Sequence, residues 1–303
     1  MSKVKALIFG RTGQVGWELQ HKLTCLGPIA VVGTPEVDFT RPDTIRDAVR
    51  RVDPAVIVNA AAYTAVDKAE SEPELAMAIN GTAPGVLAEE AKRLGCLLVH
   101  YSTDYVYDGT KHGAYVETDA TSPLNVYGKT KLAGDEAIAS IGCEHLIFRT
   151  TWVYGARGAN FLLTILRLSK EREELRIVDD QTGAPTSSDS IAQATTDVLS
   201  RVFAPAEGGL QGRSGVYNMT CAGATTWFGF AKAVLEKSAG SLGEGKPRLI
   251  PIPTIEFPRP AVRPANSRLS GDRLEEAFGV RMPDWEDALA GVLSKLRDGT
   301  ART

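Results

Sequence analysis

Tyr127 and Lys131 are the residues of this sequence whose types and spacing most directly suggest chemistry. They lie four positions apart in the stretch NVYGKTKLAGDE, residues 125–136, so on a helix their side chains share one face. A free tyrosine, with a pKa of about 10, serves poorly in proton transfer near neutral pH unless a nearby cation stabilises its phenolate. The pair therefore predicts a proton-transfer site. The alternative is a solvated helix face, which is what we expect for Lys129.

Thr103 and Asp104 form a second polar pair at a position suited to chemistry. They lie at the end of the apolar run 96–103, and two other apolar runs also end in polar stretches, at 59–64 and 148–155. The carboxyl ends of parallel strands meet at one ligand-binding edge of a sheet. A hydroxyl at Thr103 can hydrogen-bond a substrate carbonyl there and orient it for hydride transfer.

The elements that would hold these residues alternate between strands and helices. Apolar runs predict strands at 4–10, 29–33, 55–62, 96–103 and 145–155, and helical patterns lie between them at 16–26, 43–52, 73–95 and 125–140. Strands that are apolar on both faces predict a parallel sheet covered by helices on both sides. We therefore expect an α/β fold, a Rossmann-type doubly wound parallel sheet with a smaller C-terminal substrate-binding lobe.

The alternation becomes irregular after residue 154. A helix is predicted at 159–171, a short strand at 175–178 and a further helix at 284–296. We expect residues 1–153 plus roughly 186–220 to form a dinucleotide-binding domain, and roughly 154–185 and 221–303 to form a substrate domain.

The stretch GRTGQVG places Gly10, Gly13 and Gly16 between the first strand and the first helix. Backbone amides and the dipole at a helix N-terminus bind a pyrophosphate, and glycines let the backbone approach it. The spacing G-x-x-G-x-x-G differs from the G-x-G-x-x-G fingerprint of many dehydrogenases. Three turn glycines without a ligand are the alternative. The strand before the loop and four further strand–helix units favour a dinucleotide site.

The residues beyond the second strand bear on the choice of dinucleotide. An acid that would grip the ribose diol of NAD is expected about 20 residues past the glycine loop. No well-placed carboxylate follows the second strand until Glu36, and Asp38 is better suited to the adenine side. Arg11, inside the glycine loop, is placed to meet a ribose 2′-phosphate, although a solvated loop arginine is the alternative. The sequence favours NADPH, with NADH as the other option.

Seven stretches together resemble the extended short-chain dehydrogenase/reductase superfamily and, within it, the dTDP-4-dehydrorhamnose reductase family. They are GRTGQVGWEL, VNAAAYTAVDKAE, YSTDYVYDG, NVYGKTKLAGD, FRTTWVYG, DDQTGAPTS and RPANSRL. The resemblance covers nearly the whole chain. It implies NADPH-dependent reduction of dTDP-4-dehydro-β-L-rhamnose to dTDP-L-rhamnose. Tyr127 would be the proton donor, Lys131 would bind the nicotinamide ribose and lower the pKa of Tyr127, and Thr103 would align the 4-keto group.

The resemblance also implies a set of binding residues. With the glycine loop, the expected cofactor contacts are Gly10, Arg11, Gly13, Gln14, Val15, Gly16, Asp38, Phe39, Ala62, Tyr63, Thr64, Tyr101, Tyr127 and Lys131. The residues expected to touch the sugar nucleotide are Thr103, Asp104 and Trp152. A core aromatic is the alternative for Trp152.

Arg263 is a further candidate for the substrate, because a guanidinium fork matches the oxygens of a diphosphate. A surface arginine held between Pro260 and Pro264 is the alternative.

Two differences from related enzymes narrow the predicted function and the predicted metal content. Related 4,6-dehydratases carry an acidic residue directly after the Thr-Asp pair, and Tyr105 stands there in this sequence, which disfavours dehydration. Some family members bridge a dimer through Mg²⁺ held by carboxylates. Glu18 matches one ligand, but residues 184–192 offer only Asp189 where more acid is expected. The sequence therefore argues against a metal site, and we expect a monomer or a weak homodimer.

Composition excludes several other classes. The 303 residues are 43% hydrophobic and 23% charged with a net charge of −3, so no basic field favours nucleic acid. The first apolar run is too short for a signal peptide, and no run approaches membrane-spanning length. Four scattered cysteines favour buried thiols in a reducing compartment. We expect a cytoplasmic protein that acts on a dTDP-sugar, without a nucleic-acid or membrane partner.

Two alternatives stay open. One is another nucleotide-sugar 4-reductase or epimerase of the same superfamily. The other is a non-catalytic regulatory subunit resembling the methionine adenosyltransferase beta subunit. The intact set of Thr103, Tyr127 and Lys131 argues against a silent role.

Overall fold

The computed structural model describes residues 5–204, 209–210, 212–238 and 247–299. Within these ranges no helix is both long enough and apolar enough to cross a bilayer.

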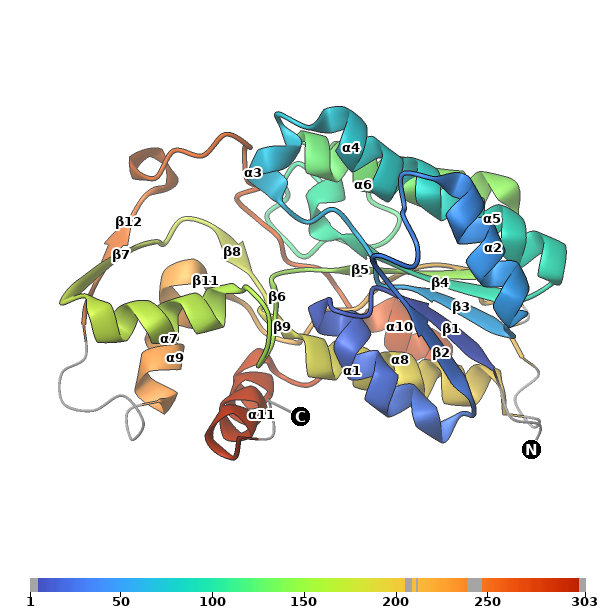
Figure 1. The fold of residues 1–303 in the computed structure, drawn as a ribbon. Helices are drawn as coiled ribbons and strands as arrows, with labels where there is room; N and C mark the ends of the chain where they lie inside the picture. The colour runs from blue at the N-terminus through green and yellow to red at the C-terminus, as the bar shows by residue number, and fades with distance from the viewer. Residues whose placement is uncertain (1–4, 205–208, 211, 239–246, 300–303) are drawn as a thin grey trace.

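A six-stranded parallel sheet is the centre of the fold (Figure 1). Its strand order is β10-β5-β4-β3-β1-β2, with bounds β1 Ala6–Phe9, β2 Ile29–Val32, β3 Val56–Asn59, β4 Leu97–Thr103, β5 His145–Thr150 and β10 Gly215–Asn218. All neighbours pair in parallel. The chain order reverses between β1 and β3, which is where an open α/β sheet forms its ligand crevice.

Helices cover both faces of this sheet. On one face lie α2 (Pro42–Val52), α5 (Ala83–Leu94) and α6 (Val126–Ile141), and on the other α1 (Gln14–Lys22), α8 (Ser188–Val202) and α10 (Asp272–Phe278). Strand β1 shows why: Ala6 and Ile8 pack into one buried cluster, whereas Leu7 and Phe9 pack into another. Side chains alternate across a strand, so a run that is apolar at every position needs cover on both sides. The predicted Rossmann-type doubly wound sheet is confirmed.

Two elements predicted as continuous are interrupted. The run 145–155 divides into β5 and β6 (Val153–Tyr154), because Trp152 takes a left-handed backbone conformation with φ 46°. The helical pattern 73–95 divides into α4 (Pro73–Met77), a π-helical turn at Ala78–Thr82, and α5. Such turns place one extra residue in a helix and shift the direction of the side chains around it.

Several elements beyond residue 185 were not predicted from the sequence. They are α8, β10, α9 (Trp227–Lys237), β12 (Arg248–Ile252) and α10. Helix α8 begins in the polar stretch TSSDS, where the Ser187 side chain accepts a hydrogen bond from the Ser190 amide at 3.0 Å. The polar side chains of this stretch therefore cap a helix.

A second group of elements lies beside the sheet, on the left of Figure 1. Strand β7 (Glu174–Val178) pairs in parallel with β12, and β8 (Thr182–Gly183) pairs antiparallel with β11 (Thr225–Thr226). Helices α7 (Phe161–Glu171) and α9 pack around them, while β9 (Thr186–Ser187) pairs with β6 and α11 (Trp285–Arg297) lies below. The predicted helices at 159–171 and 284–296 and the strand at 175–178 correspond to α7, α11 and β7.

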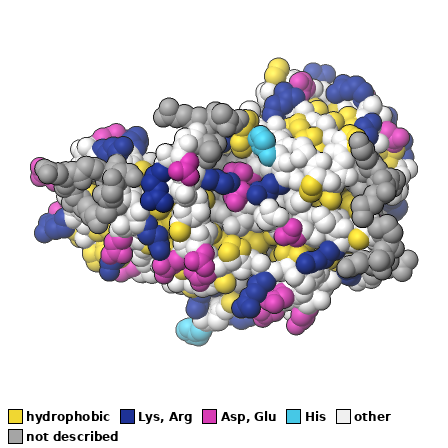
Figure 2. Space-filling model, turned by 90° about the horizontal axis from the view of Figure 1, so that it is seen from below, with side chains coloured by type: hydrophobic (Ala, Val, Ile, Leu, Met, Phe, Trp, Pro, Cys, Tyr) yellow, Lys and Arg dark blue, Asp and Glu magenta, His cyan; other side chains and the backbone are white. Residues whose placement is uncertain are grey.

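The surface carries mixed charge. Figure 2 shows the face seen from below, where basic and acidic side chains alternate with apolar and uncharged ones. Over the described residues of this face, no large area of a single sign is visible, in keeping with the net charge of −3.

Candidate active site

Tyr127 lies in the first turn of α6, beside the end of β4. The Asn125 side chain caps this helix by accepting a hydrogen bond from the Gly128 amide at 2.8 Å. Gly128 has to be a glycine, because a Cβ there would lie 2.2 Å from the Tyr105 carbonyl oxygen. This close approach sets the Tyr127 ring edge-on to the Tyr105 ring, with 5.4 Å between the ring centroids.

Thr103 and Asp104 meet Tyr127 at this point. Thr103 ends β4 and its hydroxyl accepts from the Tyr105 amide at 3.2 Å and donates to Asp104 Oδ1 at 3.1 Å. Burial raises the pKa of Tyr127, and a hydrogen bond with Thr103 acts in the opposite direction. The structure thus brings three of the predicted residues together, with the phenol held in its protonated form.

Lys131 lies one turn further along α6 and is almost completely buried, with 1% of its surface exposed. Its ammonium donates to the Tyr101 carbonyl oxygen at 2.6 Å and lies 3.0 Å from His100 Nε2. Burial lowers the pKa of Lys131 to about 8, against the opposing effect of Asp135. Both hydrogen bonds reach into the sheet, so the influence of Lys131 on Tyr127 stays a prediction.

A buried polar network beneath Lys131 was missed by the sequence analysis. His100 Nδ1 lies 3.0 Å from Asn59 Nδ2, and Asp135 accepts from Ser102 at 2.8 Å and from Arg149 at 3.4 Å. Burial, with the charge of Lys131, keeps the pKa of His100 well below its ordinary value, so its 4.0 Å approach to Asp135 is not an ion pair.

The signal for this network was present in the sequence. His100 and Arg149 are polar residues inside the apolar runs LLVHYST and HLIFRTT, and Asp135 follows Lys131 at the same spacing that separates Lys131 from Tyr127. Polar residues buried within a strand need partners, and these partners are each other.

The glycine loop lies at the crevice where the strand order reverses. Gly10 has φ +102°, and a Cβ there would lie 2.7 Å from the Ala60 backbone after β3, while a Cβ on Gly16 would lie 2.1 Å from the Gly10 oxygen. A Cβ on Gly13 would meet nothing nearer than 3.5 Å. Gly13 is the N-cap of α1 and makes no side-chain cap, so the amides of the first turn face outward. These residues fit a pyrophosphate at the helix N-terminus.

The neighbours of the loop are partly committed within the protein. Val15 packs against the buried cluster of β1, and the Gln14 side chain accepts from Asn160 at 2.9 Å. Arg11 donates to the Val31 oxygen and to Glu36 Oε2, each at 2.7 Å, and both ends of this ion pair are more than 40% exposed. Arg11 therefore lies beside the end of β2, where a 2′-phosphate would compete with Glu36.

The remaining predicted cofactor residues lie at the ends of β2, β3 and β4. Asp38 is exposed, and Phe39 packs edge-on against Phe9 with 5.6 Å between centroids. Ala62, Tyr63 and Thr64 follow β3, where the Asn80 side chain accepts from the Tyr63 amide at 2.8 Å and donates to its carbonyl at 3.0 Å.

Asn80 comes from the π-helical turn, and its role was not visible from helical periodicity. The Tyr101 ring is buried and its hydroxyl lies 2.7 Å from Thr195 Oγ1, so its contact with a cofactor stays a prediction.

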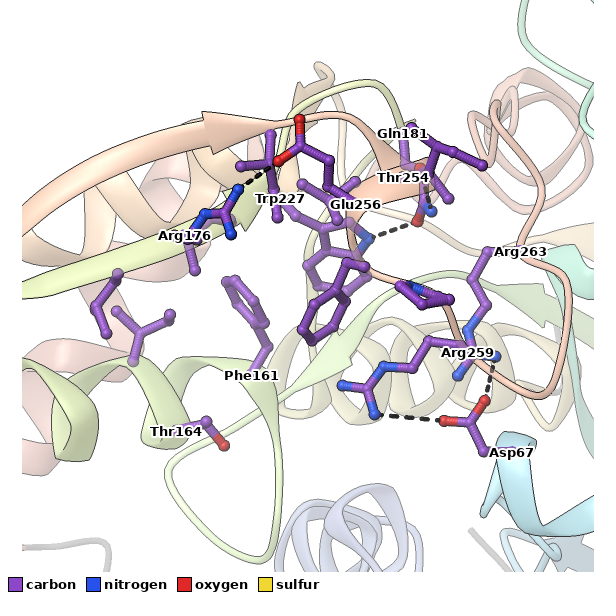
Figure 3. Close-up of a pocket in the computed structure, with 18 of the residues that line it drawn as sticks. Asp67, Phe161, Thr164, Arg176, Gln181, Trp227, Thr254, Glu256, Arg259 and Arg263 are labelled. Atoms are coloured by element: carbon purple, nitrogen blue, oxygen red, sulfur yellow. Dashed lines mark hydrogen bonds and ion pairs between the residues drawn. The ribbon is translucent and has the colours of Figure 1, made fainter.

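A cavity of about 1110 Å³ is lined mostly by the second group of elements and by residues of the segment 252–263, and Asp67 and Tyr105 reach it from the sheet side (Figure 3). Phe161 and Trp227 line one part of it, beside the ion pair of Arg176 and Glu256, and the other end carries Asp67 and Arg263. Tyr105 belongs to this second end, and its ring contacts Tyr127. The cavity therefore extends from the aromatic wall of Phe161 and Trp227 to Tyr105; Tyr127, the predicted proton donor, is not among its lining residues and lies behind that ring.

Of the predicted substrate residues, Arg263 lines the cavity, whereas Trp152 does not line it and contacts Trp227, which does. The Trp152 ring stacks on Trp227 with 3.7 Å between centroids, and a Cβ on Gly183 would lie 2.6 Å from it. A bulky residue with φ 46° is rare, and such strain gathers at functional sites. Arg263 lines the cavity and donates to Asp67 Oδ1 at 2.6 Å.

Comparisons with known proteins identify the family. A family model described as RmlD substrate binding domain matches residues 4–298. This chain belongs to that family. It is 51% identical over 289 residues to a dTDP-4-dehydrorhamnose reductase of Burkholderia thailandensis, covering 94% of this chain and 97% of that protein. It is 43% identical over 300 residues to the Escherichia coli K12 protein of the same name, covering 97% and 99%.

A solved structure resembles the fold closely as well. The dTDP-4-dehydrorhamnose reductase of Bacillus anthracis, determined in complex with NADP, superimposes with a TM-score of 0.89 at 32% identity, covering 97% of this chain and 99% of that one. The predicted membership of the extended short-chain dehydrogenase/reductase superfamily and its reductase family is confirmed.

Membership of the RmlD family raises the question of Mg²⁺, which the residues of this chain do not fit. Lys295 on α11 lies 2.6 Å from Asp189 and 3.7 Å from Glu18, and Lys22 lies 2.9 Å from Asp189. Burial works to raise the pKa of Asp189, but the two lysines outweigh it and lower the pKa. Two ammonium groups already neutralise these carboxylates and would repel a divalent cation.

We expect neither Mg²⁺ nor a chelator to affect this member of the RmlD family. Millimolar MgCl₂ or EDTA should leave the melting temperature and the mass in light scattering unchanged, because the carboxylates of Glu18 and Asp189 are paired with lysines. Magnesium-dependent stabilisation or dimer formation would contradict this expectation.

Asp104 should give the protein a pH-dependent stability. Burial raises its pKa from 3.8 to about 6, against hydrogen bonds from Ser267 and Thr103. Because the pKa is higher in the folded state, the protonated Asp104 carboxyl contributes to stability. This contribution to the free energy of unfolding is fully present below pH 3.8 and is lost as the pH rises through about 6. Relative to wild type, Asp104→Asn should gain about 3 kcal/mol in free energy of unfolding between these limits. Urea titrations at several pH values measure this, and a pH-independent difference would be contrary to it.

Proposed function

We propose that this chain catalyses the NADPH-dependent reduction of dTDP-4-dehydro-β-L-rhamnose to dTDP-L-rhamnose. The observation that carries the proposal is similarity along essentially the whole chain to proteins named dTDP-4-dehydrorhamnose reductase, with 51% identity over 289 residues in one of them. The meeting of Thr103, Asp104 and Tyr127 beside a large cavity supports it.

The glycine loop and its neighbours would hold the cofactor. The amides at the start of α1 bind the pyrophosphate, with Gly10, Gly13 and Gly16 allowing its approach. Arg11 binds the 2′-phosphate in place of Glu36, and further contacts come from Gln14, Val15, Asp38, Phe39, Ala62, Tyr63, Thr64 and Tyr101. When bound, NADPH supplies a hydride to the 4-keto carbon. The NADP complex of the Bacillus anthracis relative supports this choice over NADH.

Thr103, Tyr127 and Lys131 would complete the reduction. The Thr103 hydroxyl hydrogen-bonds the carbonyl oxygen and fixes its direction. As the carbonyl becomes an alkoxide, Tyr127 gives it a proton, so that one hydride and one proton have added across the double bond. The half-buried phenol suits an acid, because its raised pKa keeps it protonated until a strong base forms beside it. Lys131 stabilises the phenolate that remains.

The two groups of elements would divide the binding. We propose that residues 1–153 plus roughly 186–220 bind the dinucleotide and that roughly 154–185 and 221–303 bind the sugar nucleotide. Asp104, Trp152 and Arg263 would contact the sugar nucleotide; Arg263 lines the cavity, and Trp152 stacks on Trp227, which also lines it. A cytoplasmic location and a monomeric or weakly dimeric state stay predictions.

An oxidation assay tests the function. The protein is mixed with dTDP-4-dehydrorhamnose and NADPH, the absorbance of the reduced nicotinamide is followed, and the product is identified by chromatography. The alternatives give other outcomes: an epimerase interconverts sugars without net cofactor oxidation, and a regulatory subunit binds cofactor without turnover. Absence of oxidation under conditions where an authentic reductase is active would exclude the proposal.

A further inference from the structure

Two arginines and one aspartate meet at the end of the cavity that Tyr105 also lines (Figure 3). Arg263 Nη1 lies 2.6 Å from Asp67 Oδ1, and Arg259 Nη1 lies 3.9 Å from Asp67 Oδ2. Asp67 belongs to the short helix α3 (Val66–Ala69), and both arginines belong to residues 257–263, here called the strap. One carboxylate thus holds two cations that come from a distant part of the chain.

The strap is attached to the other half of the site through Asp67 and one more side chain. The Ala261 amide donates to Asp67 Oδ1 at 3.3 Å, and Asn125 donates to the Val262 oxygen at 2.8 Å. Asn125 is also the cap of α6, the helix that carries Tyr127. Asn125 therefore binds the strap and also caps the helix that carries the predicted proton donor, so one residue links the positions of the two.

The ion pair is strong enough to form and weak enough to be exchanged. Burial works to raise the pKa of Asp67, but the hydrogen bond and charge of Arg263 outweigh it, so the carboxylate is ionised at neutral pH. The side chains of Asp67, Arg263 and Arg259 are 32%, 20% and 50% exposed. Pairs with this exposure contribute little net stability, because water screens them.

The order of features along the cavity matches the order of groups in a nucleotide sugar. This step rests on the proposed function, which places the sugar at Tyr127. Tyr105 joins Tyr127 to the cavity, the arginine pair comes next, and the aromatic wall of Phe161 and Trp227 lies beyond. A diphosphate joins the sugar to the nucleoside and would fall beside the arginines. Guanidinium groups bind phosphate oxygens in paired hydrogen bonds.

We propose that Asp67 is an internal competitor for the diphosphate of the substrate. In the free protein its carboxylate occupies Arg259 and Arg263, and the diphosphate, which carries more charge and more acceptor oxygens, takes the two arginines over. A ligand without the diphosphate does not displace Asp67. The carboxylate thereby weakens the binding of diphosphate ligands without affecting nucleosides, and it keeps the arginine pair from lying uncompensated in the empty cavity.

The variant Asp67→Asn tests the competition directly. Binding of dTDP and of thymidine is measured by isothermal titration calorimetry on the full chain. We expect dTDP to bind about tenfold more tightly to the variant, since the competing charge is gone, and thymidine to bind as it does to wild type. Unchanged or weaker dTDP binding, or an equal gain for thymidine, would overturn the proposal. Weaker binding in particular would mean that Asp67 only positions the strap.

Two further variants separate this effect from others. Glu256→Gln removes an equal charge from the same cavity, where Glu256 pairs with Arg176, and it should tighten dTDP binding much less than Asp67→Asn does. If the two gains are equal, a general field explains them and the proposal fails. In an Arg263→Gln background, Asp67→Asn should lose most of its gain, and a gain that persists there would also refute the competition.

Folding and the proposed function are checked separately. Thermal melts establish that each variant is folded, and Asp67→Ser serves in place of Asp67→Asn if the latter is not. If wild type reduces the sugar but dTDP binding is unchanged in Asp67→Asn, the role of Asp67 as a competitor is refuted and the reductase assignment stands. Tighter dTDP binding by the variant, without any sugar reduction by wild type, would refute the reductase assignment alone.

Discussion

Tyr127→Phe should lower the kcat of sugar reduction by about 10²- to 10⁴-fold, the range usual for loss of a general acid. The ring keeps its edge-on contact with Tyr105, so the site should retain its shape, and only the proton is missing. The Kd of NADPH should stay within about twofold of wild type, since the variant keeps the ring and all the other expected contacts of the cofactor. Stopped-flow reduction and fluorescence titration with NADPH measure the two quantities.

Tyr105→Phe is the matched control for this result. It removes a hydroxyl from the neighbouring ring at the same end of the cavity, and its effect on kcat should be far smaller. Equal losses in the two variants would remove Tyr127 from its proposed role. Loss of NADPH binding in Tyr127→Phe would instead indicate a structural role for the hydroxyl.

Lys131→Met should lower kcat by about 10²-fold or more and, unlike Tyr127→Phe, should also weaken NADPH binding. Its ammonium is buried under the site with the Tyr101 carbonyl and His100 as partners, and its pKa is lowered to about 8. The cation therefore predominates below pH 8 and is lost as the pH rises through that value. Wild-type kcat/KM should fall on this alkaline side, and the fall should be absent in the residual activity of the variant.

Lys129→Met is the control, because Lys129 lies two residues away on the exposed side of the same helix. Its kinetic constants and pH profile should match those of wild type. The groups that face Lys131 are neutral His100 from β4 and Asp135 from its own helix, with Arg149 of β5 behind Asp135. An alkaline fall that persists in Lys131→Met would assign the titration to another group.

Local patterns predicted the parts of the site that lie close together in sequence. Strand β4 and helix α6 were placed within about two residues, because apolar runs and caps are local signals. The glycine loop was found for the same reason, and the structure adds the cause: a Cβ on Gly10 or Gly16 would strike backbone atoms. The sharing of one helix face by Tyr127 and Lys131 was also a local inference.

Contacts between distant segments could not be predicted in this way. His100 meets Asn59 because β3 and β4 pair in that register, and register is set by the packing of the whole sheet. Asp67 and Arg263 are 196 residues apart in sequence, so nothing in either segment indicates the other. Periodicity gave the face of Lys131 but not the direction of its ammonium, which depends on an acceptor at the end of β4.

A cluster of ion pairs affects the rigidity of the molecule; it consists of Glu18, Lys22, Asp189 and Lys295. Helix α1 begins at the glycine loop, α8 packs against α1, and α11 is the last helix described, yet one set of ion pairs ties all three together. A truncation that removes α11 would therefore also affect the glycine loop, although the two are far apart in sequence. It would release a brace on the helix whose first turn is expected to grip the pyrophosphate, so the far end of the chain helps to set the stiffness of the cofactor cradle.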